Sequence, residues 1–275
     1  MSTVSPRYGL NHMVCPSLTI QQFIETAHQL GVETVEFRND IGTNSLTDFA
    51  TAKAAGEQAK SLGITVLSIN ALYPFNIWNS DRAAQAVEMA KVAQACGAVG
   101  LVMCPLNDGS YTQATPQRFD MLKEALLAIT PILEDHNLIG FIEPLGFPIS
   151  SLRTKREAVE AIEAIGQSSR FKLVHDTFHH RGAGEDDYFP DHTGLVHISG
   201  LEDQDVSFDD MLDSHRLLVG PKDRLGNVEQ LQQLHKTGFN GPVSFEPFSE
   251  QVWGLNDPAT AVLDSIRYLN GALNR

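Results

Sequence analysis

Basic charge, paired cysteines and long apolar runs are all scarce in this sequence. The chain has 20 Lys and Arg against 34 Asp and Glu, which gives a formal net charge of −14. This balance disfavours nucleic acid or an anionic membrane as the main partner, because phosphate binding needs a basic face. No run of 18 apolar residues is present, so a membrane span is not expected.

The cysteines point to a reducing compartment. Cys15, Cys96 and Cys104 are an odd number and contain no CxxC pair, so we interpret them as reduced thiols. The N-terminus lacks a basic region followed by an apolar stretch, so no secretory signal is indicated. We therefore expect a cytoplasmic protein.

Four successive apolar segments each end on a residue that can bind a metal ion. A carboxylate at the end of an apolar strand is costly to bury unless a positive charge meets it. The segments are LIGFIE ending on Glu143, FKLVHD on Asp176, GLVH on His197 and PVSFE on Glu246.

Strand-like and helix-like segments alternate along the whole chain, in eight repeats of roughly 30 residues. In the first predicted helix, 19–30, Thr19 is the expected N-cap and Gly31 follows where a C-cap belongs. The Gly- and Asp-rich segment 178–191 predicts only a short helix. We predict an α/β protein with one domain over 1–275, a (β/α)8 TIM barrel. An open doubly wound sheet is the alternative, but polar residues at nearly every strand end favour the barrel.

In a barrel, the four strand-end residues would converge at one mouth. Three carboxylates so close together would repel one another, and a divalent cation would remove that conflict. Three oxygen ligands and one imidazole suit Zn, Mn, Co or Mg, and the lack of thiolates argues against a closed structural zinc site. The alternative is that each residue only caps its strand or pairs with a basic neighbour.

Longer motifs give the chain a family resemblance that covers nearly its whole length. It resembles the sugar isomerase/epimerase barrels related to the endonuclease IV superfamily, and within them the inosose (2-keto-myo-inositol) isomerases of inositol catabolism. The motifs are VEFR with Glu36 and Arg38, INALYPFN, FIEPLG, HDTFHHRGAG, VHISG and SFEPF.

The resemblance implies one divalent metal ion bound by four residues: Glu143, Asp176, His197 and Glu246. It also implies that His179 and Arg216 contact the substrate. The expected activity is isomerisation of a small keto-polyol through an enediolate that the metal stabilises. Glu143 and Glu246 are the candidate base and acid, and which of them acts first stays open.

Three further residues are candidate substrate contacts. Asn70 ends the third predicted strand and fits a ligand contact better than a turn role. Arg38 could hold a substrate hydroxyl or neutralise Glu36, and His12 is expected to line the site. The nuclease branch of the superfamily also binds metal through an Asp-x-His, so a second metal at Asp213 and His215 stays open.

Other functions compete with this prediction. A ketose 3-epimerase, a hydroxypyruvate isomerase or a dehydratase could use the same barrel, as could a non-catalytic sugar-binding protein. A nuclease acting at abasic sites is disfavoured, because Asn70 and Cys104 stand where that branch needs histidines. The expected partner is a small polyol or ketose, and homo-oligomerisation stays open.

Overall fold

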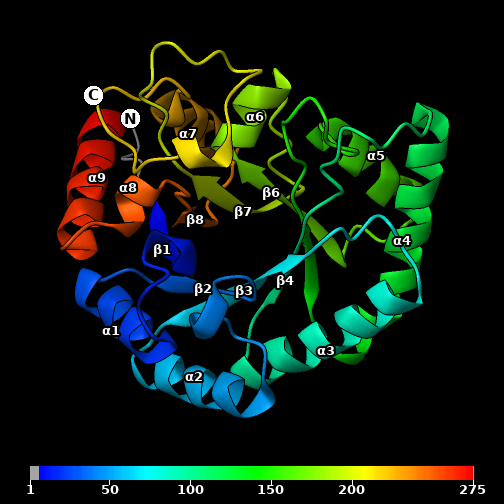
Figure 1. Cartoon of the computed structure of the whole chain (residues 1–275), viewed down its shortest axis with the longest axis horizontal. Coiled ribbons are helices and arrows are strands. Elements are labelled where there is room, and N and C mark those ends of the chain that lie inside the picture. The colour runs from blue at the N-terminus through cyan, green and yellow to red at the C-terminus, as the bar shows by residue number, and fades with distance from the viewer. Residues whose placement is uncertain (1–5, 275) are drawn as a thin grey trace.

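Eight parallel strands form a closed barrel in the computed structural model, which describes residues 6–274 (Figure 1). Each strand pairs with the next along the chain, and β1 closes the barrel by pairing with β8. This confirms the predicted (β/α)8 architecture. The strands are β1 (Arg7–Asn11), β2 (Thr34–Arg38), β3 (Thr65–Leu72), β4 (Gly100–Met103), β5 (Ile139–Ile142), β6 (Phe171–Asp176), β7 (Thr193–Ile198) and β8 (Pro242–Phe245).

The helices surround the barrel (Figure 1). They are α1 (Ile20–Leu30), α2 (Phe49–Ser61), α3 (Ser80–Cys96), α4 (Thr115–Asp135), α5 (Lys155–Ala164), α6 (Thr177–Ala183), α7 (Asn227–Lys236), α8 (Glu250–Trp253) and α9 (Pro258–Leu273). Short 3-10 turns are η1 (His12–Val14), η2 (Gly42–Asn44) and η3 (Asp213–His215). No helix in the described residues is long and apolar enough to span a membrane.

The helix ends follow from local chemistry. Thr19 caps α1 by accepting from the backbone N–H of Gln22, whose side chain accepts in turn from the Thr19 N–H. Gly31 ends the helix with φ of 68°, a left-handed conformation that glycine adopts without a Cβ clash. Both caps were predicted from the sequence, and α6 is short, as the composition of 178–191 indicated.

Two local features differ from the sequence prediction. The sequence predicts a first strand over Tyr8–Met13, but β1 ends at Asn11, whose side chain accepts from the Met13 N–H and turns the chain into η1. The helix α8 was not predicted, because its four residues are too few to show a helical period.

Apolar side chains fill the barrel interior below the polar strand ends. Val174 and Leu195 belong to this interior cluster, and they precede Asp176 and His197 by two residues on the same strands. Residues two apart on a strand point to the same face. The barrel therefore has a packed apolar floor beneath Asp176 and His197.

Candidate metal centre

The four predicted ligands come together at the carboxyl ends of β5 to β8. Their ligand atoms lie within 4.8 Å of one another and all four side chains are buried. Glu143 and Glu246 directly follow the last residues of β5 and β8, whereas Asp176 and His197 lie inside β6 and β7. The spacing and the donor types fit a divalent cation with three oxygen ligands and one nitrogen.

Asp176 is held in place by the backbone that follows it. Its Oδ1 accepts from the N–H groups of Phe178 and His179, at 2.7 and 3.1 Å, so it caps the N-terminus of α6. Its Oδ2 accepts from Arg216 at 2.6 Å. The carboxylate therefore has a fixed orientation before any ion binds.

His197 is fully buried and meets carboxylates on both sides of its ring. Nδ1 lies 3.0 Å from Oε1 of Glu143 and 3.1 Å from Oε2 of Glu246, while Nε2 lies 3.1 Å from Oε1 of Glu36. Burial alone would lower the pKa of His197, but the three carboxylates outweigh it and raise the pKa well above its usual value. Carboxylates on both sides of the ring thus favour its protonated form, and a metal ion bound at Nδ1 would take the place of a proton there.

Glu246 accepts hydrogen bonds on both of its oxygens. Oε1 accepts from Arg38 at 2.8 Å and from Asn11 at 3.0 Å, and Oε2 accepts from Arg216 at 3.0 Å. Burial acts to raise the pKa of Glu246, but His197 and then the two arginines lower it far below the usual range.

Both arginines of the site are already paired. Arg38 makes a two-point contact with Asp40, with both distances at 2.7 Å, in addition to its bond with Glu246. Both guanidinium groups also contact the Phe248 ring, whose centre lies 5.1 Å from Arg38 and 4.6 Å from Arg216. Arg38 has no ion pair with Glu36 in the described residues. The carboxylates that it neutralises are those of Asp40 and Glu246.

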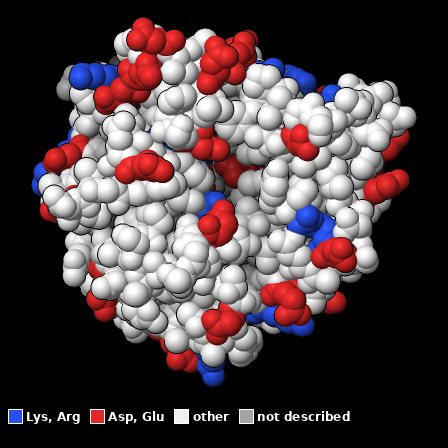
Figure 2. All heavy atoms as spheres, in the orientation of Figure 1, with Lys and Arg blue, Asp and Glu red and all other residues white. Residues whose placement is uncertain are grey.

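A cavity of about 250 Å³ opens above the cluster. The face in Figure 2 is hollowed near its centre, where acidic and basic side chains gather. The cavity is lined by Arg38, Asp40, Asn70, Ala71, Tyr73, Cys104, Asn107, Glu143, Leu145, Phe147, His179, Asp213, Arg216, Glu246 and Phe248. Four of the five candidate substrate contacts, namely Arg38, Asn70, His179 and Arg216, therefore line one cavity.

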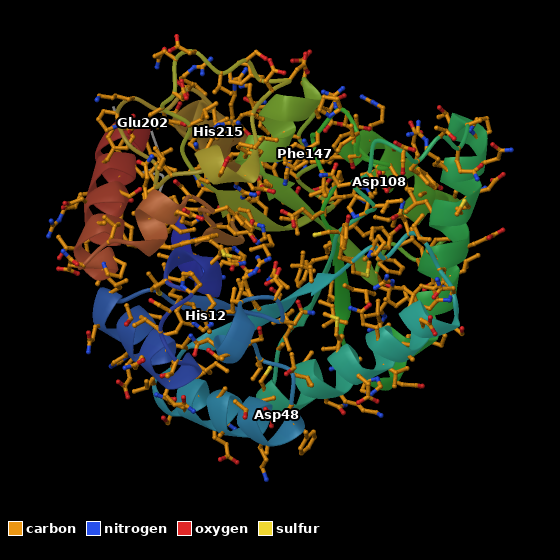
Figure 3. All side chains as sticks on the ribbon, in the orientation of Figure 1. His12, Asp48, Asp108, Phe147, Glu202 and His215 are labelled. Atoms are coloured by element: carbon orange, nitrogen blue, oxygen red, sulfur yellow. The ribbon has the colours of Figure 1, made fainter. Side chains whose placement is uncertain are left out.

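His12 is the fifth candidate, and it does not line this cavity. Its ring stacks on Phe23 at 4.3 Å and its Nε2 contacts the Leu18 carbonyl at 3.0 Å. Figure 3 shows His12 beside β1 and α1, whereas Phe147 lies toward β6 and α6. Its Nδ1, like that of His179, is buried without a hydrogen-bond partner among the described residues.

His179, in contrast to His12, lines the cavity. Its side chain lies edge-on to Phe147, and its buried Nδ1 has no hydrogen-bond partner among residues 6–274. Gly146 fixes the approach, since a Cβ added there would lie 2.1 Å from the His179 carbonyl oxygen. Arg153 ties the two segments together through the carbonyls of Gly146 and Gly182.

The structure does not assemble a second metal centre from Asp213 and His215. His215 accepts from the Leu212 N–H at its Nδ1, and Asp213 pairs with Arg216 at 3.3 Å. Within the described part of the chain, the four-residue cluster is the one group that meets the geometry of a metal site.

Two residues near the centre were missed as site residues by the sequence analysis. Glu36 contacts His197 from β2, and the Cys104 thiol donates to Oε2 of Glu143 at 3.3 Å. A signal for Glu36 was present, because Glu36 and Arg38 are two residues apart on one strand and so share a face. For Cys104, no sequence pattern distinguishes a thiol that only fills space from one that donates a hydrogen bond.

Fold and site together define a class of protein, a (β/α)8 barrel with a buried carboxylate and imidazole cluster at the carboxyl ends of its strands. The chain belongs to the xylose isomerase-like TIM barrel family, whose profile matches residues 24–272. No curated protein matches the sequence. The family match confirms the barrel superfamily that the motifs indicated.

Solved structures agree with this family. A xylose isomerase domain containing protein from Salmonella typhimurium is 30% identical over 100% of both chains, with a TM-score of 0.88. An IolI protein with a bound zinc atom is 18% identical over 97% of this chain and 98% of its own, with a TM-score of 0.79. D-Psicose 3-epimerase from Clostridium cellulolyticum, solved with D-tagatose, is 15% identical over 98% and 100%, with a TM-score of 0.74. The last two likenesses show the fold alone.

Proposed function

We propose that this protein is a divalent-metal-dependent isomerase of a small uncharged keto-polyol, with a keto-inositol (inosose) as the preferred substrate. The observation that carries the proposal is the pair Glu143 and Glu246. Both line the cavity and both lie within 3.1 Å of the same imidazole nitrogen. Two carboxylates at one centre can remove a proton from one carbon and return a proton to the next.

A bound divalent ion would supply Lewis acidity, which polarises a carbonyl and acidifies the adjacent C–H. Glu143, Asp176, His197 and Glu246 would hold that ion. One glutamate accepts the carbon-bound proton, which gives an enediol-type intermediate, and passes that proton to the old carbonyl oxygen. The other takes up the proton of the substrate hydroxyl that becomes the new carbonyl and donates a proton to the neighbouring carbon. The carbonyl moves by one position and no atom is gained or lost. His179, with its unpaired Nδ1, would hold or pass on the proton of a substrate hydroxyl.

The charge of the cavity supports an uncharged substrate. Its two arginines already pair with Asp40, Asp176 and Glu246, so neither is left to bind a phosphate or a carboxylate. The motifs INALYPFN and HDTFHHRGAG support inosose within this class. Zinc is the first ion to test, because the IolI structure of the same fold holds a zinc atom.

A ketose 3-epimerase is the second candidate, supported by the likeness in fold to D-psicose 3-epimerase. It would use the same two carboxylates, but the proton would return to the same carbon from the opposite face. The products therefore separate the two functions. An isomerase moves the carbonyl, whereas an epimerase inverts one centre and leaves the carbonyl in place.

The test is a screen of inososes and ketoses with Zn²⁺, Mn²⁺, Co²⁺ or Mg²⁺, followed by NMR in heavy water. We expect inosose to isomerise with deuterium incorporated at the carbon that receives the proton, and chelation to abolish turnover. Product without deuterium would favour a shielded transfer or a hydride shift. Incision of abasic DNA at enzyme-like rates by the same protein would contradict the proposal, as would binding of every ketone without turnover.

A further inference from the structure

Glu36 is a buried carboxylate that the proposed chemistry does not use. Its side chain is fully buried, and in the described residues its one ion-pair partner is His197. The Ser68 hydroxyl donates to Oε2 at 2.6 Å, and the Asn70 amide donates to the same oxygen at 3.2 Å. A carboxylate this deep without a lysine or arginine partner calls for an explanation.

The two nitrogens of His197 face different groups. Nδ1 faces Glu143 and Glu246 inside the ligand cluster, whereas Nε2 faces Glu36 at 3.1 and 3.2 Å from its two oxygens. Nδ1 can bind a metal ion only with its lone pair free, and a neutral imidazole then carries its proton on Nε2. A carboxylate beside Nε2 stabilises that tautomer and fixes the ring plane.

We propose that Glu36 is the positioning residue that holds His197 with Nε2–H directed to β2 and the Nδ1 lone pair directed to the metal. Ser68 and Asn70 in turn fix Glu36, so β2 and β3 support a ligand that belongs to β7. This inference rests on the metal site of the proposed function. It explains the buried carboxylate as a partner of the ligand and not of Arg38.

The first test measures Zn²⁺ affinity without substrate, by competition with a chelator, for the wild type and Glu36→Gln. In the variant, the donors Ser68 and Asn70 retain the amide oxygen at the Oε2 position and turn the amide NH₂ toward Nε2. We expect affinity to fall about 10–100-fold. The matched control is Glu185→Gln, which removes a buried carboxylate paired with Lys155 and leaves His197 untouched. Its Zn²⁺ affinity should equal that of the wild type.

The second test reads the tautomer directly by NMR of ¹⁵N-histidine in the zinc-loaded protein. The wild type should show His197 protonated at Nε2 and zinc-bound at Nδ1, with the Nε2 proton shifted downfield by the carboxylate. Glu36→Gln should lose or move that signal, which a purely structural role would leave in place. If that variant fails to fold, Ser68→Ala retains the carboxylate and removes one donor, and it should give a smaller shift in the same direction.

The outcomes separate this inference from the proposed function. Unchanged affinity and an unchanged Nε2 signal in Glu36→Gln would overturn the inference. Failure of the wild type to bind Zn²⁺ would overturn it together with the metal site. Tight Zn²⁺ binding that weakens in Glu36→Gln, without turnover of any ketone, would support the inference and reject the isomerase.

Discussion

The β8 side and the β5 side of the candidate metal centre surround their glutamates in opposite ways. On the β8 side, Glu246 accepts from Arg38, Arg216 and Asn11. On the β5 side, Glu143 has no lysine or arginine partner within residues 6–274, and its Oε2 accepts only from the Cys104 thiol, a weak donor.

This difference favours unequal roles for the carboxylates of Glu143 and Glu246 in the proposed mechanism. A carboxylate held by two guanidinium groups is a stable anion and a poor proton acceptor. A carboxylate whose free oxygen meets only a thiol can accept a proton with little loss of hydrogen bonding. We therefore expect Glu143 to remove the first proton from carbon. Glu246 starts as an anion and acts mainly as a fixed ligand, and it serves the return step only after taking up the proton of the substrate hydroxyl.

The largest expected effect is that of Glu143→Gln. The change is nearly isosteric, so the fold should persist, while the rate should fall by about 10²–10⁴-fold, the usual contribution of a positioned base. Single-turnover experiments in heavy water should show that deuterium exchange at the substrate carbon falls together with product formation. Metal content must be measured on each preparation, because part of the loss can come from weaker binding.

Glu246→Gln is the partner experiment. It should slow turnover as well. If Glu143 is the base, deuterium exchange at the first carbon should be better preserved in Glu246→Gln than in Glu143→Gln. A metal-loaded Glu246→Gln protein with full activity would end the two-carboxylate mechanism. Equal loss of exchange in both variants would remove the distinction between the two sides.

Arg216→Met should produce the next largest effect, on stability. Arg216 is 1% exposed and pairs with Asp176 and Glu246. Its loss leaves the buried Asp176 carboxylate without an ion-pair partner among the described residues, while Glu246 keeps Arg38 and His197. Breaking a buried pair in this way costs about 3–5 kcal/mol. Urea unfolding of the metal-free protein measures the cost, and added Zn²⁺ should restore part of it.

A matched control for that variant is Arg267→Met in α9. Its ion pair with Asp264 is exposed, and pairs of this kind contribute about 0.5 kcal/mol or less. If Arg216→Met unfolded at the same urea concentration as Arg267→Met, the ion pairs of Arg216 with Asp176 and Glu246 would not contribute to the free energy of unfolding.

The smallest expected effect is on the β5 side, at Cys104. Cys104→Ala removes one weak hydrogen bond from Glu143 and should change kcat/KM by less than about 10-fold, which is equivalent to about 1.4 kcal/mol. Cys104→Ser provides a stronger donor and makes the β5 side more like the β8 side. We expect Ser to lower the rate more than Ala does, and the reverse order would count against Glu143 as the base.

The architecture and the four-residue cluster were predictable because they depend on local rules. Apolar strands that end on Glu143, Asp176 and His197 place polar groups at one end of a parallel barrel, whatever the details of packing. Thr19 and Gly31 mark the ends of α1 through backbone chemistry within a few residues. Such signals survive in a linear sequence.

The partnerships across the barrel were not predictable. Glu36 and Arg38 share a face of β2, yet their partners lie on different strands. Glu36 contacts His197 on β7, whereas Arg38 donates to Glu246, the residue after β8, because barrel closure decides which strand each faces. His12 illustrates the same limit. A histidine after a strand suggested a lining role, but whether the ring meets the cavity or Phe23 depends on the turn at Asn11.

The close approach at Gly146 constrains how this site can diversify. Because backbone meets backbone there, the loop that bears Phe147 and the helix that bears His179 cannot shift independently. One wall of the cavity is therefore a single rigid piece, and any larger side chain at Gly146 would displace both residues at once. New substrate preferences are more readily selected or engineered at lining residues outside this piece, such as Tyr73, which is 42% exposed, and Asn107. A library for altered specificity should begin with those two positions.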